Sequence, residues 1–448
     1  MHVLGGKEEE YGEAYTIKAD YLISAVGQLN VPYTPGISGL TDFKGKLVHS
    51  ARWNLSNDLS GQRVAIIGNG KLKDRSMKVV SNLLMVIKGA TAIQIVPELA
   101  KVASKLTLFQ RTPNWVMPRD DEAYPRRTRM LLHSIPMARS FYRASLMDRS
   151  EGFHQPLTGM GSSASEQLRD WCLGHMHSQL PDRKDLWKTL TPAYAPGCKR
   201  ILISNDFYPT LLQENVKVET TAIKRLTPTG IETVDGQEIQ YDCIILATGF
   251  RTGDLLQSLP ISGLGGRAMQ EIWKQEGVHA LYGIGVEDMP NFSMLYGPNT
   301  NLAHNSIILM IEAQARYIQT LVSKVVNARN QGQRLVITPR RSRVHDYNDH
   351  IQQRLSSTSF ADPKCQSWYK TEEGRITNNW YGTVVQYQNM LATVHWSDFD
   401  VIGFGAETLK GMNTNIGRVV EESRLNLTVL VAMGSAVALA AGFKYMFR

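Results

Sequence analysis

The stretch V-A-I-I-G-N-G, residues 64–70, decides the fold that we expect for this chain. Four consecutive apolar residues that run into Gly68 and Gly70 are typical of a buried parallel strand that delivers its end to a nucleotide phosphate. Glycine lets the backbone approach a pyrophosphate, and the N-terminus of a following helix supplies amide donors and a partial positive charge. A lone G-x-G is weak evidence, so the flanking residues must support the interpretation.

The residues that follow the glycines do not immediately form the expected helix. Residues 71–89 separate Gly70 from A-T-A-I-Q at 90–94, and joining Gly70 directly to Ala90 gives a G-x-G-x-x-A turn with Gln94 on the first helical turns. We interpret residues 71–89 as a retained intron. The alternative is a genuine surface insertion.

The second strand of the expected domain is L-T-L-F-Q-R-T, residues 106–112, whose end presents Arg111 and Thr112. An acidic residue at this position selects NAD by bonding the ribose hydroxyls, whereas arginine accommodates the 2′-phosphate of NADP. Arg111 therefore favours NADP as the nucleotide. The alternative is a solvated surface arginine.

Composition limits the classes of function. The 448 residues leave room for two or three domains, and the net charge of +8 is spread along the chain. This charge suggests an anionic cofactor rather than a nucleic-acid track. No C-x-x-C or Cys/His metal pattern occurs, so we expect no metal site and a reduced intracellular setting. The cysteines are Cys172, Cys198, Cys243 and Cys365.

A family resemblance lies just before the first strand. The pattern F-x-G-x-x-x-H-x-x-x-W, met by Phe43, Gly45, His49 and Trp53, resembles the fingerprint of flavin-dependent Baeyer-Villiger monooxygenases. Related N- and S-oxygenating flavin monooxygenases usually carry tyrosine where this chain has Trp53. Asn54 departs from the family, which usually has proline or aspartate there, and this leaves the sub-branch open.

The resemblance implies an enzyme that uses FAD, NADP(H) and molecular oxygen to insert one oxygen atom beside a ketone, giving an ester or lactone. Two alternatives stay open. The first is an N- or S-oxygenating flavin monooxygenase. The second is a catalytically inactive, truncated and membrane-anchored remnant. No nucleic-acid partner is expected.

The resemblance also assigns roles to residues. In P-A-Y-A-P-G-C-K-R (192–200), Lys199 would bind the NADP phosphate and Arg200 would be the active-site arginine, because a guanidinium that stays charged can stabilise developing oxyanion charge. A structural salt bridge is the alternative for Arg200. Trp380 would line the substrate region or simply pack in the core, and His304 is expected to be structural rather than a base. The further cofactor-binding residues are Ala25, Gly27, Gln28, Ala247, Thr248 and Gly249.

The order of these parts predicts an α/β fold with two Rossmann-like dinucleotide-binding domains, a helical insert and a C-terminal apolar helix. Residues 18–32 look like a buried strand late in an FAD domain, so the chain looks N-terminally truncated. The expected division is 1–57 and 247–422 for the FAD domain and substrate region, 58–120 and 192–246 for the NADP domain, 121–191 for the helical insert, and 425–443 for a transmembrane helix.

The last stretch of the chain is uncharged and mostly apolar. Residues 427–443 are flanked by Arg424 and Lys444, and about 17 to 25 such residues can cross a bilayer as a helix. We therefore expect a single-pass C-terminal membrane anchor, with the catalytic domains in the cytoplasm. The alternatives are a buried helix and a soluble cytoplasmic protein.

Overall fold

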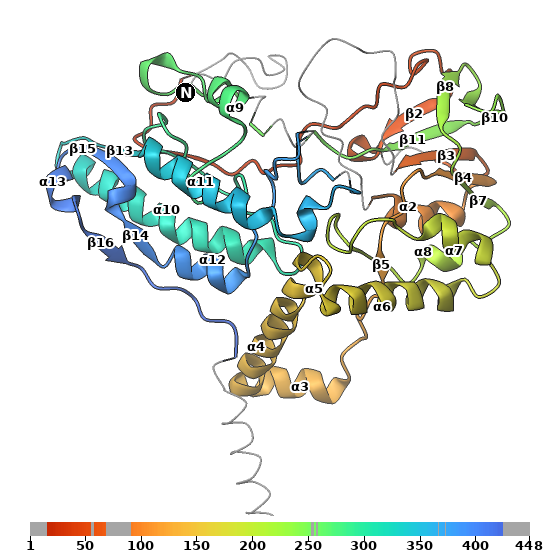
Figure 1. Cartoon of the computed structure of the whole chain (residues 1–448), viewed down its shortest axis with the longest axis horizontal. Helices are drawn as coiled ribbons and strands as arrows, with labels where there is room; N and C mark the ends of the chain where they lie inside the picture. Colours follow the sequence, from red (N-terminus) through yellow and green to blue (C-terminus); the bar gives the residue numbers. More distant parts are fainter. Residues whose placement is uncertain are drawn as a thin grey trace, which may run out of the picture.

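A computed structural model describes residues 16–54, 58–68, 91–251, 255–256, 259–365, 367–371 and 373–423. Figure 1 shows two lobes, with a group of helices below and between them. One lobe is built around a parallel sheet, and the other is built around two long helices. The predicted α/β class is confirmed.

The first lobe contains a five-stranded sheet in which every neighbouring pair is parallel, in the order β2-β11-β3-β4-β7. Strand β3 lies at its centre, and Val64, Ala65 and Ile66 are fully buried. The apolar run at 64–67 therefore forms the buried parallel strand that the sequence predicts. The strands are β2 (Lys46–His49), β3 (Arg63–Gly68), β4 (Lys105–Phe109), β7 (Val216–Glu219) and β11 (Cys243–Ala247).

Both faces of this sheet are covered. Successive side chains along a strand point to opposite faces, so neighbouring residues of β3 pack against different layers. On one face, Val64 and Ile66 pack with helix α2 (Thr91–Ala100) and with residues of α7 (Lys184–Leu190) and α8 (Phe207–Thr210). On the other face, Ala65 and Ile67 pack on a small antiparallel sheet. That sheet consists of β8 (Ile223–Thr227), β9 (Gly230–Thr233) and β10 (Glu238–Gln240).

The helical insert lies between β5 (Val116–Met117), which follows β4, and β6 (Leu202–Ile203), and these two short strands pair in parallel. The predicted insert is present, and its arginines at 126, 127, 129, 139, 143 and 149 are exposed. Its helices are α3 (Arg126–Ser134), α4 (Pro136–Gly152), α5 (His154–Thr158) and α6 (Ser163–Gln179), drawn below the lobes in Figure 1.

The second lobe packs around the long helix α10 (Ile307–Asn330) and helix α11 (Arg341–Leu355). Its core includes the fully buried Tyr317 and Tyr387. Short ladders join β13 to β15 and β14 to β16. The remaining elements are α9 (Met269–Glu276), β12 (Phe292–Met294), β13 (Leu335–Pro339), α12 (Val384–Met390), β14 (Thr393–His395), β15 (Phe399–Gly403), α13 (Ala406–Leu409) and β16 (Asn413–Asn415).

The strand expected at 18–32 differs from the prediction. Strand β1 covers only Leu22–Ser24 and pairs in parallel with β12. The prediction that it is buried is wrong, because Leu22 and Ile23 are 37% and 43% exposed. Among the described residues, β12 is its only paired strand, so the apolar run alone does not bury it.

Two cysteines correct the expectation of a fully reduced chain. Cys198 and Cys365 form a disulfide, whereas Cys172 and Cys243 are free and buried. Burial raises the pKa of the Cys172 thiol to about 12, so this thiol stays protonated. The sequence gives no sign of the pairing, because 167 residues separate the two bonded cysteines.

Some predictions lie outside the described residues. Gly70, the segment 71–89 and the apolar run 427–443 belong to the ranges that the structure does not describe. Among the helices in the described ranges, none combines the length and apolar character that a bilayer-spanning segment needs. The limits of the proposed domains stay predictions. Strand β2, at residues 46–49 within the predicted FAD segment 1–57, is a strand of the same five-stranded sheet as β3 and β4.

Candidate functional site

The end of β3 is closely packed around Gly68. A Cβ atom on Gly68 would lie 3.1 Å from the Cβ of Ala92 in α2 and 3.5 Å from the Cβ of Ala247 in β11. Helix, strand and neighbouring strand thus approach one another closely where β3 ends. Gln94 lies on the same helix and is exposed. This is the close strand–helix packing that the G-x-G-x-x-A pattern predicts.

The end of β4 meets the loop at 192–200. The Tyr194 hydroxyl donates to the carbonyl of Pro113 at 2.8 Å, and the Trp115 indole N–H donates to the carbonyl of Tyr194 at 2.9 Å. The Lys199 ammonium lies 4.5 Å from the centre of the Tyr194 ring, and Lys199 is 5% exposed. The fold therefore brings Lys199 to the strand end that carries Arg111 and Thr112.

Arg111 is exposed, and partial burial still lowers the pKa of its guanidinium. No carboxylate in the described part of the chain pairs with it. Next to it, the amide nitrogens of Gln110 and Asn114 are buried without a hydrogen-bond partner among the described residues. Buried donors of this kind normally have a partner, so this edge is suited to a ligand that carries acceptors.

Arg200 is exposed and faces the second lobe. Burial raises the pKa of Tyr296 to about 12, and the positive charge of Arg200 acts in the opposite direction and lowers it. The pKa of Tyr369 is likewise raised by burial and opposed by the charge of Arg200. Cys198, two residues earlier, is bonded to Cys365 of the second lobe. The disulfide therefore fixes the loop that carries Arg200 against that lobe.

The N-terminal segment reaches the same place through Gln28. Its side-chain nitrogen donates to the carbonyls of Tyr296 at 2.9 Å and Gly297 at 3.2 Å, and its oxygen accepts a hydrogen bond from Asn378. Gly27 has a positive φ of 76° with open space where a Cβ would lie, and Ala25 is exposed. Three segments distant in sequence thus converge around Tyr296.

The strand end at 247–249 passes beside another part of the N-terminal segment. The buried Thr248 hydroxyl donates to the Tyr33 carbonyl, and the Tyr33 N–H donates to the Gly249 carbonyl at 2.8 Å. The Arg251 N–H donates to the carbonyl of Val31 at 2.8 Å. The A-T-G sequence therefore lies against the N-terminal segment, and its role as a crossover between domains stays a prediction.

The fingerprint residues have local structural reasons. A Cβ on Gly45 would lie 2.4 Å from the Phe43 ring and 2.7 Å from the Asp242 carbonyl, so only glycine fits. The His49 Nδ1 atom accepts a hydrogen bond from the Ala51 N–H at 3.1 Å, and the His49 ring makes an edge contact with Phe250. His49 therefore joins the end of β2 to the crossover after β11.

Known proteins are similar to this chain in sequence. The chain is 47% identical over 441 residues to the FAD-binding monooxygenase ktnD of Aspergillus niger, covering 98% of this chain and 68% of that protein. It is 36% identical over 389 residues to a Baeyer-Villiger monooxygenase of Streptomyces coelicolor, covering 86% of this chain and 70% of that enzyme. The chain belongs to the Baeyer-Villiger monooxygenase family.

The fold of this monooxygenase also matches a crystal structure of OTEMO in complex with FAD and NADP. The TM-score is 0.70 at 22% identity, covering 86% of this chain and 75% of that one. No family model matches the chain. The recognition of the family from the fingerprint is confirmed, and these relatives lend no support to the alternative of an inactive remnant.

Trp380, for which the sequence leaves substrate lining and core packing open, and His304, which is expected to be structural, both have side chains in the interior. Trp380 is 3% exposed, its indole N–H donates to the Thr383 carbonyl at 3.1 Å, and its ring lies against Tyr381. The side chain of His304 is 1% exposed, with Nε2 3.1 Å from a carboxylate oxygen of Glu151. Both side chains therefore contribute to packing or to contacts between elements in this structure.

Sequence analysis missed Glu151, which joins the helical insert to the second lobe. At the end of α4, its carboxylate accepts hydrogen bonds from the side chain of Asn305 at 2.8 Å and from the backbone N–H groups of Val384 and Val385 at 3.3 Å. The last two groups lie at the N-terminus of α12, where a negative charge is favoured. No motif marks this glutamate.

Proposed function

We propose that this chain is an NADPH- and FAD-dependent Baeyer-Villiger monooxygenase in which Arg200 is the catalytic arginine. The observation that carries the proposal is the convergence of the Arg200 loop, the Gln28 segment and the turn at 296–301 between the two lobes. When bound, FAD supplies the redox and oxygen chemistry, and the protein supplies position and charge. The products are an ester or lactone, NADP⁺ and water.

The residues present fit a bound dinucleotide at the first lobe. Close packing at Gly68 leaves the backbone free of a side chain where β3 ends, ahead of helix α2. Unpaired donors of Gln110 and Asn114 lie at the next strand end. Arg111 and Lys199 would hold the 2′-phosphate of NADP, and Thr112 and Gln94 would contact the same nucleotide. A guanidinium is well matched to a phosphate because it presents a planar fork of donors.

The residues at the crossover fit the flavin side. Ala247, Thr248 and Gly249 are small, and the backbone of 247–251 lies against residues 31–33. Ala25, Gly27 and Gln28 would border the FAD, since Gly27 leaves open space and Gln28 is fixed by the Tyr296 turn. Trp380 lies behind this turn, because its backbone N–H donates to the Asn301 carbonyl at 2.9 Å.

Arg200 would stabilise the negative charge that develops on oxygen as the ketone is attacked. Its charge is permanent at working pH, and it lies beside two tyrosines whose high pKa values keep them neutral. Neither tyrosine therefore neutralises the guanidinium. Loss of one preorganised donor at a developing oxyanion costs ~3 kcal/mol, on the order of a hundredfold or more in rate.

The test is Arg200→Ala in protein loaded with FAD, with Arg169→Ala as control because Arg169 is an exposed arginine on α6. Ketone oxygenation should fall on the order of a hundredfold or more, whereas NADPH oxidation continues and yields hydrogen peroxide. Arg200→Lys should also be poor, because an ammonium lacks the planar fork. Oxygenation of ketones by Arg200→Ala at the parent rate would exclude this role.

Heteroatom oxygenation is the second candidate function. The observation against it is Trp53, because N- and S-oxygenating relatives usually have tyrosine there. Competition of a ketone against an amine and a sulfide in one reaction mixture separates the two functions. Preferential consumption of the sulfide or amine would favour the second candidate.

The C-terminal anchor stays a prediction from the sequence. It rests on the uncharged apolar run at 427–443, outside the described residues. If this run anchors the protein, deleting residues 423–448 should move it from the membrane pellet to the supernatant. Full-length protein that is extracted by alkaline carbonate would exclude an anchor.

A further inference from the structure

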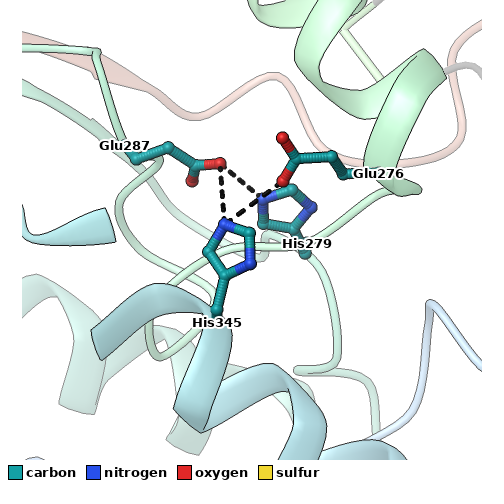
Figure 2. Close-up of side chains that lie close together, drawn as sticks. All are labelled: Glu276, His279, Glu287 and His345. Atoms are coloured by element: carbon teal, nitrogen blue, oxygen red, sulfur yellow. Dashed lines mark hydrogen bonds and ion pairs between the residues drawn. The ribbon is translucent and has the colours of Figure 1, made fainter. Parts of the chain in front are cut away.

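Four potential metal ligands converge in the second lobe, away from the proposed oxygenation site. Figure 2 shows Glu276 at the end of α9, His279 and Glu287 in the chain that follows it, and His345 on α11. One ligand atom from each of these residues lies within 4.8 Å of all the others. The sequence showed no metal-binding pattern, so this cluster is a product of the fold.

The nitrogen and oxygen atoms that face one another in the cluster lie close together. His279 Nε2 lies 2.8 Å from Glu287 Oε1, and His345 Nε2 lies 3.2 Å from Glu276 Oε2 and 3.8 Å from Glu287 Oε1. Tetrahedral zinc with bonds of about 2.0–2.2 Å separates its ligand atoms by roughly 3.4 Å. The observed spacing therefore needs only small side-chain movements to enclose such an ion.

The ring of His279 is oriented as in a metal ligand. Its Nδ1 lies 2.6 Å from the carbonyl of Gly277, and a carbonyl can only accept, so Nδ1 carries a proton. In a neutral ring, Nε2 then presents a lone pair toward the Glu287 carboxylate. That contact requires either a proton between the two atoms or a cation. A metal-bound histidine commonly donates its other N–H to a backbone carbonyl.

The unpaired atoms favour the cation. Glu276 Oε2 and His345 Nε2 are buried atoms that make no well-aligned hydrogen bond within the described part of the chain, although they lie 3.2 Å from each other. A second proton on His279 would satisfy its contact with Glu287, but the contact between Glu276 and His345 would need a further proton on His345. An ion between the four side chains takes electron pairs from both histidines and both carboxylates. Buried polar atoms normally have such partners.

The surroundings hold the ligands in place. Arg341 lies 2.6 Å from Glu276 Oε1, the carboxylate oxygen that faces away from the cluster, and Arg267 lies 3.8 Å from the same oxygen. These positive charges oppose a cation, but the two glutamates supply two negative charges nearer to it. Glu287 and His279 have side chains only 1% and 4% exposed, whereas that of His345 is 41% exposed and gives an ion a path inward.

We propose that Glu276, His279, Glu287 and His345 bind one zinc ion as a structural site. Two imidazole nitrogens with two carboxylate oxygens suit zinc, whereas magnesium and calcium prefer oxygen ligands alone. The ion would fasten the chain at 276–287 to α11. That chain leads directly into β12 and the turn at 296–301, so the zinc site supports the layer beneath the proposed flavin side.

The first measurement is the metal content of the full chain, purified without a histidine tag and analysed by inductively coupled plasma mass spectrometry. We expect about one zinc per chain. After removal of metal with a chelator, Zn²⁺ should raise the thermal midpoint in a concentration-dependent way, because a ligand that binds only the folded state stabilises it. Co²⁺ should give the strong visible absorption of a tetrahedral centre.

Variants assign the ligands. His345→Ala and Glu276→Gln should lose stoichiometric zinc, whereas His350→Ala should retain it, because His350 is exposed on the same helix and lies outside the cluster. Arg341→Ala should bind zinc about 10- to 100-fold more weakly, as is typical when a residue that orients a ligand is lost. Circular dichroism checks that each variant is folded. If His345→Ala does not fold, Glu276→Gln still tests the zinc site.

Three outcomes would overturn the zinc site. The first is wild-type protein that contains no zinc and, after chelation, binds neither Zn²⁺ nor Co²⁺. The second is zinc content that is unchanged in both His345→Ala and Glu276→Gln. Nitrogen NMR that shows a doubly protonated His279 ring in zinc-treated protein would assign the cluster to ion pairs instead.

Discussion

Strands β3 and β1 have similar sequences and very different surroundings. Each is an apolar run that leads to a glycine, V-A-I-I-G at 64–68 and L-I-S-A-V-G at 22–27. Strand β3 pairs with β11 and β4 and has a packed layer on each face, whereas β1 pairs with β12 alone among the described strands. An apolar run thus specifies an extended chain, but distant segments decide whether that chain is buried.

The same contrast separates the two lobes. In the first, alternate side chains of parallel strands form the core, and this pattern is visible in the sequence. In the second, many contacts join a polar side chain to a distant backbone carbonyl, as with Gln28 and Asn299. Variants in the two lobes should therefore differ in how much they lower the free energy of unfolding. They should also differ in whether that loss depends on reductant or pH.

The largest effect is expected in the buried strand. Ile66→Ala should lower the free energy of unfolding by ~2–5 kcal/mol, because the site is fully buried and cannot collapse around the cavity. Ile23→Ala is the matched control in β1, where the side chain is 43% exposed, and should change stability by less than ~1 kcal/mol. Chemical denaturation measures both. Equal losses would show that β1 is buried in solution.

The disulfide between Cys198 and Cys365 should stabilise the folded chain by ~2–4 kcal/mol, because it closes a long loop in the unfolded state. A reducing agent should therefore lower the denaturation midpoint of the wild-type chain. Cys365→Ser should start at the lower midpoint and show no further response to the reductant. If the denaturation midpoint of the wild-type chain is the same with and without the reductant, the disulfide adds no stability.

Asn299 shows what a polar contact contributes in the second lobe. Its side-chain nitrogen donates to the carbonyls of Ile376 at 2.8 Å and Asn379 at 3.1 Å, and its φ is 55°. Asn299→Ala should cost ~2–3 kcal/mol, combining unpaired buried carbonyls with a left-handed backbone that alanine disfavours.

Two further variants divide that cost. Asn299→Gly keeps the left-handed backbone free of strain and should lose only the hydrogen bonds, ~1–2 kcal/mol. Asn330→Ala, at the exposed end of α10, should change stability by less than ~0.5 kcal/mol. If the glycine and alanine variants are equally stable, the backbone conformation contributes nothing to the loss.

The sequence predicts what depends on local pattern. Strands β3, β4 and β11, the helix α2 and the family follow from apolar runs and short motifs. Gly45 and Gly68 are recognised from short motifs, although the neighbours that crowd them include Asp242 and Ala247, which are distant in the sequence. The proposed roles of Arg111, Lys199 and Arg200 come from the same motifs, and the experiments above test them.

The sequence does not predict contacts that need the complete fold. Gln28 meets Asn378 across 350 residues, and Cys198 meets Cys365 across 167. Glu276, His279, Glu287 and His345 have no recognisable ligand spacing, because the fourth comes from a separate helix. Polar residues such as Glu151 carry no periodicity that would mark them. Their partners are decided only when the lobes pack together.

Glu151 gives the smallest expected effect and the one that depends on pH. Burial would raise its pKa, but hydrogen bonds from His304, Asn305 and the Val385 N–H hold the pKa at about 2, below the ordinary 4.5. A depressed folded-state pKa stabilises the protein above the unfolded value. This contribution should therefore be complete above pH 4.5 and should disappear as the pH falls from 4.5 toward 2.

Glu151→Gln tests this contribution. It keeps one acceptor oxygen and loses the charge, so it should cost ~1–2 kcal/mol at neutral pH, less than the full value of the pKa shift. The difference in unfolding free energy between wild type and variant should shrink as the solution is acidified. Glu166→Gln, which removes an exposed i,i+3 pair with Arg169, should change stability by less than ~0.5 kcal/mol at any pH. A wild-type-to-Glu151→Gln difference that stays constant between neutral pH and pH 3 would mean that the Glu151 charge does not join the insert to the second lobe.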